Sequence, residues 1–242
     1  MKTLFLLLFI GFSSVVNAQT FDEIFQQYLT SQKKQNNYQT DVRFALYKGV
    51  SGQKAYESYT GHKAVLDQSS YMKLGPTEFV VGKDFYIKLN TSEKAILFSN
   101  TFQGSTANPT QVDFEKIRTY IKEKALTDLG NQWKLEFNLK NISAIGYSKL
   151  ELYLDKQSLR PLKQVAYMAH LYDFALLDQE LLSEDQRTDI PRIEVVYSNF
   201  TKTIKMDKKR FTKAYYVAEY KGEFQPSDRF ETFELIPFQD KL

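Results

Sequence analysis

The feature that most constrains this chain is a regular alternation of apolar and polar side chains between Asp41 and Asn100. Successive side chains of a strand point to opposite faces of a sheet, so a period of two predicts one buried face and one wet face. Gly, Asn, Asp and Ser interrupt the alternation at short intervals, which is typical of tight turns. The stretch therefore predicts an antiparallel meander with an apolar face that something must cover. The apolar residues of its two clearest runs are Val42, Phe44, Leu46, Phe85, Ile87 and Leu89.

The alternation returns further along the chain. Residues 131–140 form the clearest run, and residues 150–154, 159–171, 192–197 and 230–236 also fit strands. Short turns separate the first three of these runs, so we expect them to be consecutive neighbours in one antiparallel sheet. The apolar face of the clearest run carries Trp133, Leu135, Phe137 and Leu139.

Two amphipathic helices are expected beside the sheet. The first begins at Thr20, because Thr20 and Glu23 make a capping box in which each side chain accepts from a free backbone N–H. The second is expected to begin at Thr110, with Asp113 as its capping partner, and to end at Gly130. The apolar stripes are Phe21, Ile24, Phe25, Tyr28 and Leu29 in the first helix, and Val112, Phe114, Ile117, Tyr120 and Ile121 in the second.

Composition and charge narrow the class of protein. The 242 residues are 43% hydrophobic and 25% charged, which is ordinary for a globular protein. No repeat or low-complexity linker divides the chain, so one domain is expected. The net charge of +3 gives no reason to expect a nucleic acid as partner. Aromatic residues make up 15%, which fits half-buried strands and also a lined ligand cavity.

The N-terminal end is expected to be a cleaved secretory signal over residues 1–18, followed by a single domain over residues 19–242. Lys2 supplies the positive region, Leu4 to Ile10 the apolar core, and Val16-Asn-Ala18 the cleavage site. No later stretch is long and apolar enough for a transmembrane helix. The chain has no Cys, which excludes a lipid-modified N-terminal Cys and any disulfide. A periplasmic or secreted protein is expected.

The search for catalytic chemistry is negative. The two histidines, His62 and His170, have no metal-ligand spacing. The chain has no Gly-x-Ser-x-Gly turn and no phosphate-binding Gly-rich loop, and without Cys thiol catalysis is excluded. Paired carboxylates such as Glu180 and Glu184 are better explained as solvent-exposed charges than as catalytic groups. We therefore expect a protein that is not an enzyme and uses no metal or cofactor.

Five stretches of the chain follow one another in an order that is also found in a known protein family. Tyr38 to Leu46 would be a first strand after an N-terminal helix, residues 71–81 a strand that passes a Pro, and Asp84 to Phe98 the next pair. Leu150 to Val165, with its Leu-Arg-Pro, would be a hairpin, and Tyr197 to Phe200 a C-terminal strand. This order resembles the periplasmic lipoprotein carriers of the LolA/LolB type.

The resemblance implies an α+β fold: a strongly curved antiparallel sheet, or incomplete β-barrel, with helices packed on its concave face. It implies a non-catalytic carrier whose partner is a lipid or an acylated protein, held between sheet and helices. The alternative is a structural or assembly protein of the cell envelope that uses the same fold with a filled core. The expected ligand contacts are Phe44, Leu46, Phe85, Ile87, Trp133 and Phe137.

The chain departs from that family at Gly82-Lys83-Asp84, where the family has an Asp-Gly turn, and at Tyr172 to Arg192, where it has a tight hairpin. The longer stretch carries Leu176, Leu177 and other apolar residues before a polar run over residues 183–189. Long loops without structure are uncommon in compact domains and are usually functional or disordered. We expect a short helix or flap at the barrel rim, acting as a lid, as a contact for an envelope protein, or as an excursion without a role.

Overall fold

The computed structural model describes residues 19–67, 69–100, 112, 114–140, 146–174 and 188–238. The expected signal segment, the start of the expected second helix at Thr110, and most of the Tyr172 to Arg192 stretch lie outside the described residues.

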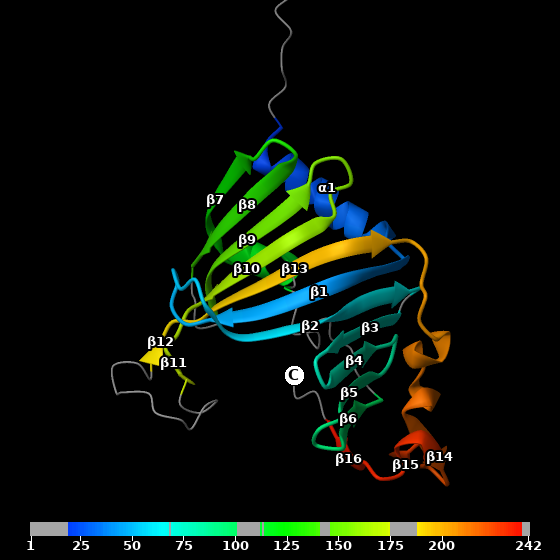
Figure 1. Ribbon diagram of the computed structural model, residues 1–242. Helices are drawn as coiled ribbons and strands as arrows, with labels where there is room; N and C mark the ends of the chain where they lie inside the picture. Colours follow the sequence, from blue (N-terminus) through cyan, green and yellow to red (C-terminus); the bar gives the residue numbers. More distant parts are fainter. Residues whose placement is uncertain are drawn as a thin grey trace, which may run out of the picture.

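Within the described residues, twelve strands form one large curved sheet in the order β16-β6-β5-β4-β3-β2-β1-β13-β10-β9-β8-β7 (Figure 1). Neighbouring strands are antiparallel, apart from the parallel pair of β16 and β6. The sheet does not close, because β16 and β7 are its two edges. The strands are β1 Asn37–Tyr47, β2 Ala55–Leu66, β3 Ser69–Leu74, β4 Thr77–Val81, β5 Tyr86–Asn90, β6 Ala95–Ser99, β7 Ile121–Asp128, β8 Gln132–Leu139, β9 Tyr147–Asp155, β10 Pro161–Met168, β13 Arg192–Thr201 and β16 Glu234–Pro237.

Strand β13 joins two meanders. It lies between β1 and β10, with Val42 opposite Tyr197 and Gln164 opposite Val195. The first meander is β1 to β6, and the second is β7 to β10. The predicted neighbours over residues 131–140, 150–154 and 159–171 are confirmed as β8, β9 and β10.

Helix α1, Phe21–Lys34, begins as the capping box predicts. The backbone N–H of Thr20 donates to Glu23 Oε2 at 2.8 Å, and the N–H of Glu23 donates to Thr20 Oγ1 at 3.3 Å. The predicted apolar stripe is buried, and Figure 1 shows α1 lying along one face of the half of the sheet that contains β7 to β10. The buried residues of the cluster that contains this stripe are Phe21, Ile24, Phe25, Tyr28, Leu29, Phe114, Ile117, Leu135, Phe137, Leu139, Leu150, Leu152, Leu154 and Ala166.

The prediction of a second long helix is wrong. The structure has a single turn, α2 Phe114–Ile117, followed by the 3-10 turn η1 Arg118–Tyr120, and then strand β7. The apolar residues at helical spacing extend only to Ile121, and from there the chain pairs with β8. That pairing satisfies the backbone N–H and C=O groups that the edge of β8 would otherwise leave open.

The meander from β2 to β6 is apolar on both faces, so the prediction of a single apolar face is wrong for this half. Neighbours on β4, Phe79 and Val80, are both buried and belong to two different clusters. The C-terminal segment, residues 202–233, covers the face opposite to that of α1 (Figure 1). Its elements are η4 Lys208–Phe211, η5 Lys213–Tyr215, β14 Val217–Tyr220, β15 Glu223–Pro226 and η6 Asp228–Phe230.

The last predicted strand, residues 230–236, starts later than expected, as β16 from Glu234. The ends of the Tyr172 to Arg192 stretch pair with each other, as β11 Tyr172–Asp173 and β12 Thr188–Asp189. Across the described ranges, none of the helices has the length and apolar character needed to cross a bilayer. Over the described residues the fold is therefore mostly sheet, with one long helix on one face of a curved, unclosed sheet.

Candidate functional site: a pocket beside the helix

A pocket lies between the C-terminal end of α1 and strands β1, β2, β10 and β13. Its volume is about 400 Å³, within the range typical of small-molecule sites. The pocket is open at one side and has a large apolar surface. The apolar and aromatic residues that line it include Tyr28, Leu29, Tyr38, Val112, Phe114, Pro161, Leu162 and Phe200.

Strand register brings the pocket residues together. Thr40 on β1 is opposite Lys63 on β2, so both side chains face α1. The Thr40 hydroxyl donates to the backbone carbonyl of Ser198 on β13 at 2.7 Å. This bond gives the buried Thr40 hydroxyl a hydrogen-bond partner, and it links β1 to β13 at the pocket.

One wall of the pocket is an aromatic stack. The rings of Tyr38 and Phe200 are stacked with their centroids 5.2 Å apart. The guanidinium carbon of Arg160 lies 4.3 Å from the centroid of the Phe200 ring, within the range of a cation–π contact. Arg160 Nε also donates to Ser158 Oγ at 2.8 Å, so the guanidinium is held in place beside the ring.

Among the described residues that line the pocket, the charged ones are Lys33, Lys63 and Arg160. Lys63 is only 8% exposed, so its stem and ammonium group are largely removed from water. Burial, with a smaller contribution from Tyr38, raises the pKa of Tyr28 well above its usual value. The Tyr28 phenol is therefore neutral near pH 7 and adds no negative charge to the pocket.

Two glutamine side chains at the pocket carry buried polar atoms without a partner in the described structure. These atoms are Nε2 of Gln32, on α1, and Oε1 of Gln164, on β10. Gln164 is 8% exposed. An unmade hydrogen bond at a buried amide costs about 1–3 kcal/mol, so a ligand that supplied the missing partners would recover this free energy.

The six ligand contacts predicted from the sequence lie in different parts of the fold, and none of them lines this pocket. Phe137 is fully buried under α1, and Trp133 packs at the edge of the same cluster. Phe44 and Leu46 follow Thr40 along the same face of β1. Phe85 and Ile87 face the C-terminal segment on the opposite side of the sheet. As contacts of an acyl chain the six stay a prediction.

The pocket residues themselves escaped prediction, although one signal for them exists in the sequence. Gln164 interrupts the apolar side of β10, between Leu162 and Ala166. A polar residue at an inward position of an alternating strand has to find a partner. That interruption is the signal in the sequence that points to the pocket. Lys63 and Arg160 give no such signal, because charged residues of these types are common on any protein surface.

A second polar group lies on the other face of β1. His62 Nδ1 is 2.6 Å from Asp41 Oδ1, and Asn199 Nδ2 donates to Asp41 Oδ2 at 2.7 Å. The hydrogen bond from Asn199, followed by that from His62, holds the pKa of Asp41 below its usual value. The pair is exposed to solvent. Within the described part of the chain, no group of three or more His, Cys, Asp or Glu side chains could hold a metal ion.

Comparison with known proteins finds similar folds among solved structures. The chain is similar to an uncharacterized conserved protein of Thermus thermophilus, with 15% identity, a TM-score of 0.47, and coverage of 88% of this chain and 98% of that one. A putative outer membrane lipoprotein-sorting protein domain of Vibrio parahaemolyticus is 16% identical, with a TM-score of 0.42 and coverage of 79% and 95%. A LolA superfamily protein of Nitrosomonas europaea is 14% identical, with a TM-score of 0.36 and coverage of 82% and 100%.

No family model matches the chain, and no curated protein is similar to it. The similar structures include a member of the family that the sequence resembles. At these identities and TM-scores the likeness carries no argument about function, so the function proposed below is derived from the pocket.

Proposed function

We propose that this protein is a non-catalytic, exported carrier of the cell envelope that binds an acyl chain of a lipid or an acylated protein. The ligand would lie between α1 and the concave face of the sheet. The observation that supports this proposal is the pocket of about 400 Å³, lined by aromatic and aliphatic side chains, beside the end of α1. Burial of each CH₂ group of a chain there would contribute about 0.8 kcal/mol.

One observation favours a second candidate, a structural or assembly protein of the envelope. Under the first turns of α1 the core is solid, because Leu135, Phe137 and Leu152 have no exposed surface. A protein whose helix and sheet are packed in this way gains stability from that interface whether or not it carries a ligand. The two candidates differ in whether the natively purified protein contains lipid.

Native mass spectrometry and lipid extraction of the purified protein test the carrier proposal. We expect bound lipid in the wild type and its loss from Leu162→Trp, because the larger ring would occupy the pocket. Leu129→Trp is the matched control, since Leu129 is 46% exposed in the turn after β7. Both variants should keep the melting temperature of the wild type to within a few degrees.

Failure of the wild type to hold or take up any lipid would reject the carrier and favour the structural role. Retention of lipid by Leu162→Trp at wild-type level would place the ligand elsewhere. In that case the six residues predicted from the sequence become the next positions to change, beginning with Phe44 and Leu46, which lie on the same face of β1 as Thr40.

The stretch from Tyr172 to Arg192 remains part of this proposal as a contact for an envelope protein. The exposed fractions of Leu171 and Tyr172, 68% and 38%, support this role, because these two residues present apolar surface to solvent at the start of the stretch. Replacing residues 178–189 by a short Gly-Ser link should leave lipid binding intact and weaken cross-linking to envelope proteins in cells. Unchanged cross-linking would remove the stretch from the proposal.

A further inference from the structure

We propose that the protein docks on an anionic lipid bilayer through a basic run, which comprises Lys202, Lys205, Lys208 and Lys209 at the start of the C-terminal segment. This inference goes beyond the proposed carrier function, because the basic run lies outside the residues that line the pocket.

The first argument is the distribution of charge along the C-terminal segment. Residues 202–213 carry six Lys or Arg and one acidic residue, Asp207, whereas residues 214–233 carry two Lys or Arg and four Asp or Glu. Figure 1 shows the segment leaving the end of β13, with β14 and β15 at its far end. Positive charge is therefore concentrated in the first part of the segment. Clusters of about four to eight Lys or Arg are typical of surfaces that bind anionic lipid.

The second argument is that the fold holds the basic run at the surface. Ile204, Met206 and Phe211 pack into the cluster between the C-terminal segment and the sheet, whereas the four lysines of the run are exposed. Arg210 is turned inward, because its guanidinium donates to the carboxylate of Glu78. The inward residues alternate with the lysines, so their packing directs the lysine side chains together to the solvent.

The third argument is that the fold itself does not use these charges. Among the described residues, no carboxylate forms an ion pair with a lysine of the basic run. Asp207 accepts from the backbone N–H of Lys209 at 3.0 Å and so caps η4, and Glu78 pairs with Arg210. Like charges at close quarters repel one another, so the run does not stabilise the fold. A partner with negative charge would remove this repulsion.

The form of the basic run favours a bilayer over a small anion. Lysine is a strongly hydrated point charge on a flexible stem, and all four side chains of the run are exposed. A site for one anion needs donors that are fixed around it. A diffuse negative surface needs only several cations that reach it, and each of them contributes about fivefold to the binding constant.

The position of the basic run favours a bilayer over an acidic protein. The run begins two residues after Phe200, which lines the pocket. The backbone N–H of Lys205 donates to Gln39 Oε1 at 3.1 Å, and Gln39 lies between the pocket residues Tyr38 and Thr40. Docking through the run therefore brings one edge of an apolar pocket next to the partner, and a bilayer is the partner that offers acyl chains there.

Co-sedimentation of the purified protein with lipid vesicles tests the proposal. The vesicles are pure phosphatidylcholine, which has no net charge, or phosphatidylcholine with about one-third of anionic phosphatidylglycerol. We expect the wild type to bind the anionic vesicles at least about a hundredfold more tightly in about 0.1 M salt. About 1 M salt should abolish this preference, because it shortens the screening length to about 3 Å.

Two matched variants place the binding at the basic run. Replacement of its four lysines by Gln should weaken binding to the anionic vesicles by at least about thirtyfold. The control replaces four other exposed lysines by Gln, which changes the net charge equally, and should weaken binding by less than about threefold. The control positions are Lys54, Lys88, Lys94 and Lys140. Should a melting curve show that the first variant has not folded, the double variants Lys202→Gln/Lys205→Gln and Lys208→Gln/Lys209→Gln decide.

The outcomes separate this inference from the carrier proposal. Equal binding of the wild type to both kinds of vesicle, or equal losses in the two variants, overturns docking through the basic run. Absence of binding to either vesicle also overturns it and leaves an acidic protein as the partner. Each of these results leaves the carrier standing, because native mass spectrometry measures bound lipid independently. The variant without the four lysines should retain that lipid, and its loss would overturn a docking surface separate from the pocket.

Discussion

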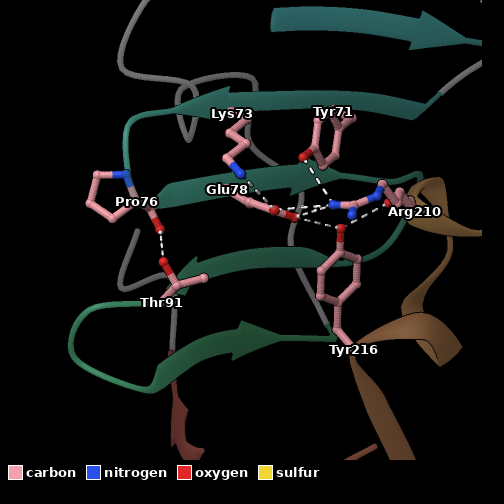
Figure 2. A network of polar contacts seen from close by, with 7 residues as sticks. All are labelled: Tyr71, Lys73, Pro76, Glu78, Thr91, Arg210 and Tyr216. Atoms are coloured by element: carbon pink, nitrogen blue, oxygen red, sulfur yellow. Dashed lines mark hydrogen bonds and ion pairs between the residues drawn. The ribbon is translucent and has the colours of Figure 1, made fainter. Parts of the chain in front are cut away.

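The guanidinium of Arg210 is hydrogen-bonded to the carboxylate of Glu78 through one nitrogen, Nη1, which lies 3.0 Å from Oε1 and 3.1 Å from Oε2 (Figure 2). Glu78 is on β4 and only 5% exposed. The Tyr216 hydroxyl donates to the same carboxylate at 3.3 Å, and Arg210 Nη1 is 3.3 Å from the Tyr71 hydroxyl. The C-terminal segment is thus fastened to β3 and β4 by groups that compensate a buried charge.

Arg210→Met should lower the free energy of unfolding by roughly 1.5–3 kcal/mol, the range for hydrogen bonds to a charged group. The larger cost of breaking a fully buried pair does not apply, because the Arg210 side chain is 33% exposed. Urea denaturation measures the change. Lys208→Met, at an exposed position of η4, is the control and should change stability by less than about 0.5 kcal/mol. Equal effects of the two variants would contradict this account.

Phe137→Ala should cost roughly 3–5 kcal/mol of stability. The Phe137 ring is fully buried, and its centroid lies 5.1 Å from that of Phe21, 5.2 Å from that of Phe25 and 5.4 Å from that of Phe114. Its loss would leave a cavity under α1. Thermal or urea unfolding measures the cost, with Leu129→Ala as the exposed control. A small loss of stability accompanied by loss of bound lipid would instead support the sequence-based prediction of Phe137 as a ligand contact.

Stability should fall in acid through Glu136. Hydrogen bonding from Lys149, at 2.7 Å, is the main cause that holds the pKa of Glu136 below its usual value of 4.5, and burial opposes it. A carboxyl whose pKa is lower in the folded state stabilises the fold above its unfolded pKa, and this contribution is lost as the pH falls through the folded pKa. The window therefore opens near pH 4.5 and extends downward.

Lys149→Met tests this by comparison of urea unfolding at about pH 6 and about pH 3.5, on either side of the upper end of that window. The wild type should lose more stability over this interval than the variant, because the variant has already lost the ion pairs of Lys149 with Glu136 and Glu151 at the higher pH. Lys88→Met should follow the wild type, since Lys88 lies on β5, away from Glu136. A variant that is as acid-sensitive as the wild type would show that another carboxyl controls the effect.

Removal of residues 232–242 should cause aggregation. Leu235 on β16 pairs with Ile96 on β6, so the deletion exposes the backbone of β6 as an open edge, which is a template for another chain. Light scattering and gel filtration measure the result. Deletion of residues 239–242 alone leaves β16 in place and should give a monodisperse protein. A monodisperse product from the longer deletion would contradict this role of β16.

Local signals in the sequence predict much of this fold. The capping box at Thr20 and the alternation over residues 131–140 each depend on near neighbours, and both are confirmed. The predicted extension of the second helix to Gly130 is wrong because the helical period ends at Ile121. From there the chain pairs with β8, which lies beyond a turn that periodicity does not see. Tertiary pairing overrides a short apolar pattern of this kind.

The candidate site is less predictable, for a reason that Phe85 and Ile87 illustrate. Alternation places them on one side of their strand, but it does not say which side faces α1. Both residues lie on the face that the C-terminal segment covers, and that segment follows them by more than a hundred residues in the chain. The pocket depends on Lys63 and Arg160, whose types are those of ordinary surface residues, so only their placement reveals them.

The position of β13 between β1 and β10 has a consequence for how the chain reaches its folded state. Val42 pairs with Tyr197, so the centre of the sheet joins residues from nearly opposite ends of the chain. Contacts of such long range are costly in loop-closure entropy, and folds built on them form on the millisecond to second scale. A chain that emerges N-terminus first cannot unite its two meanders until Thr201 has appeared. Vectorial synthesis or export therefore delivers two separate half-sheets, and the last third of the polypeptide completes them.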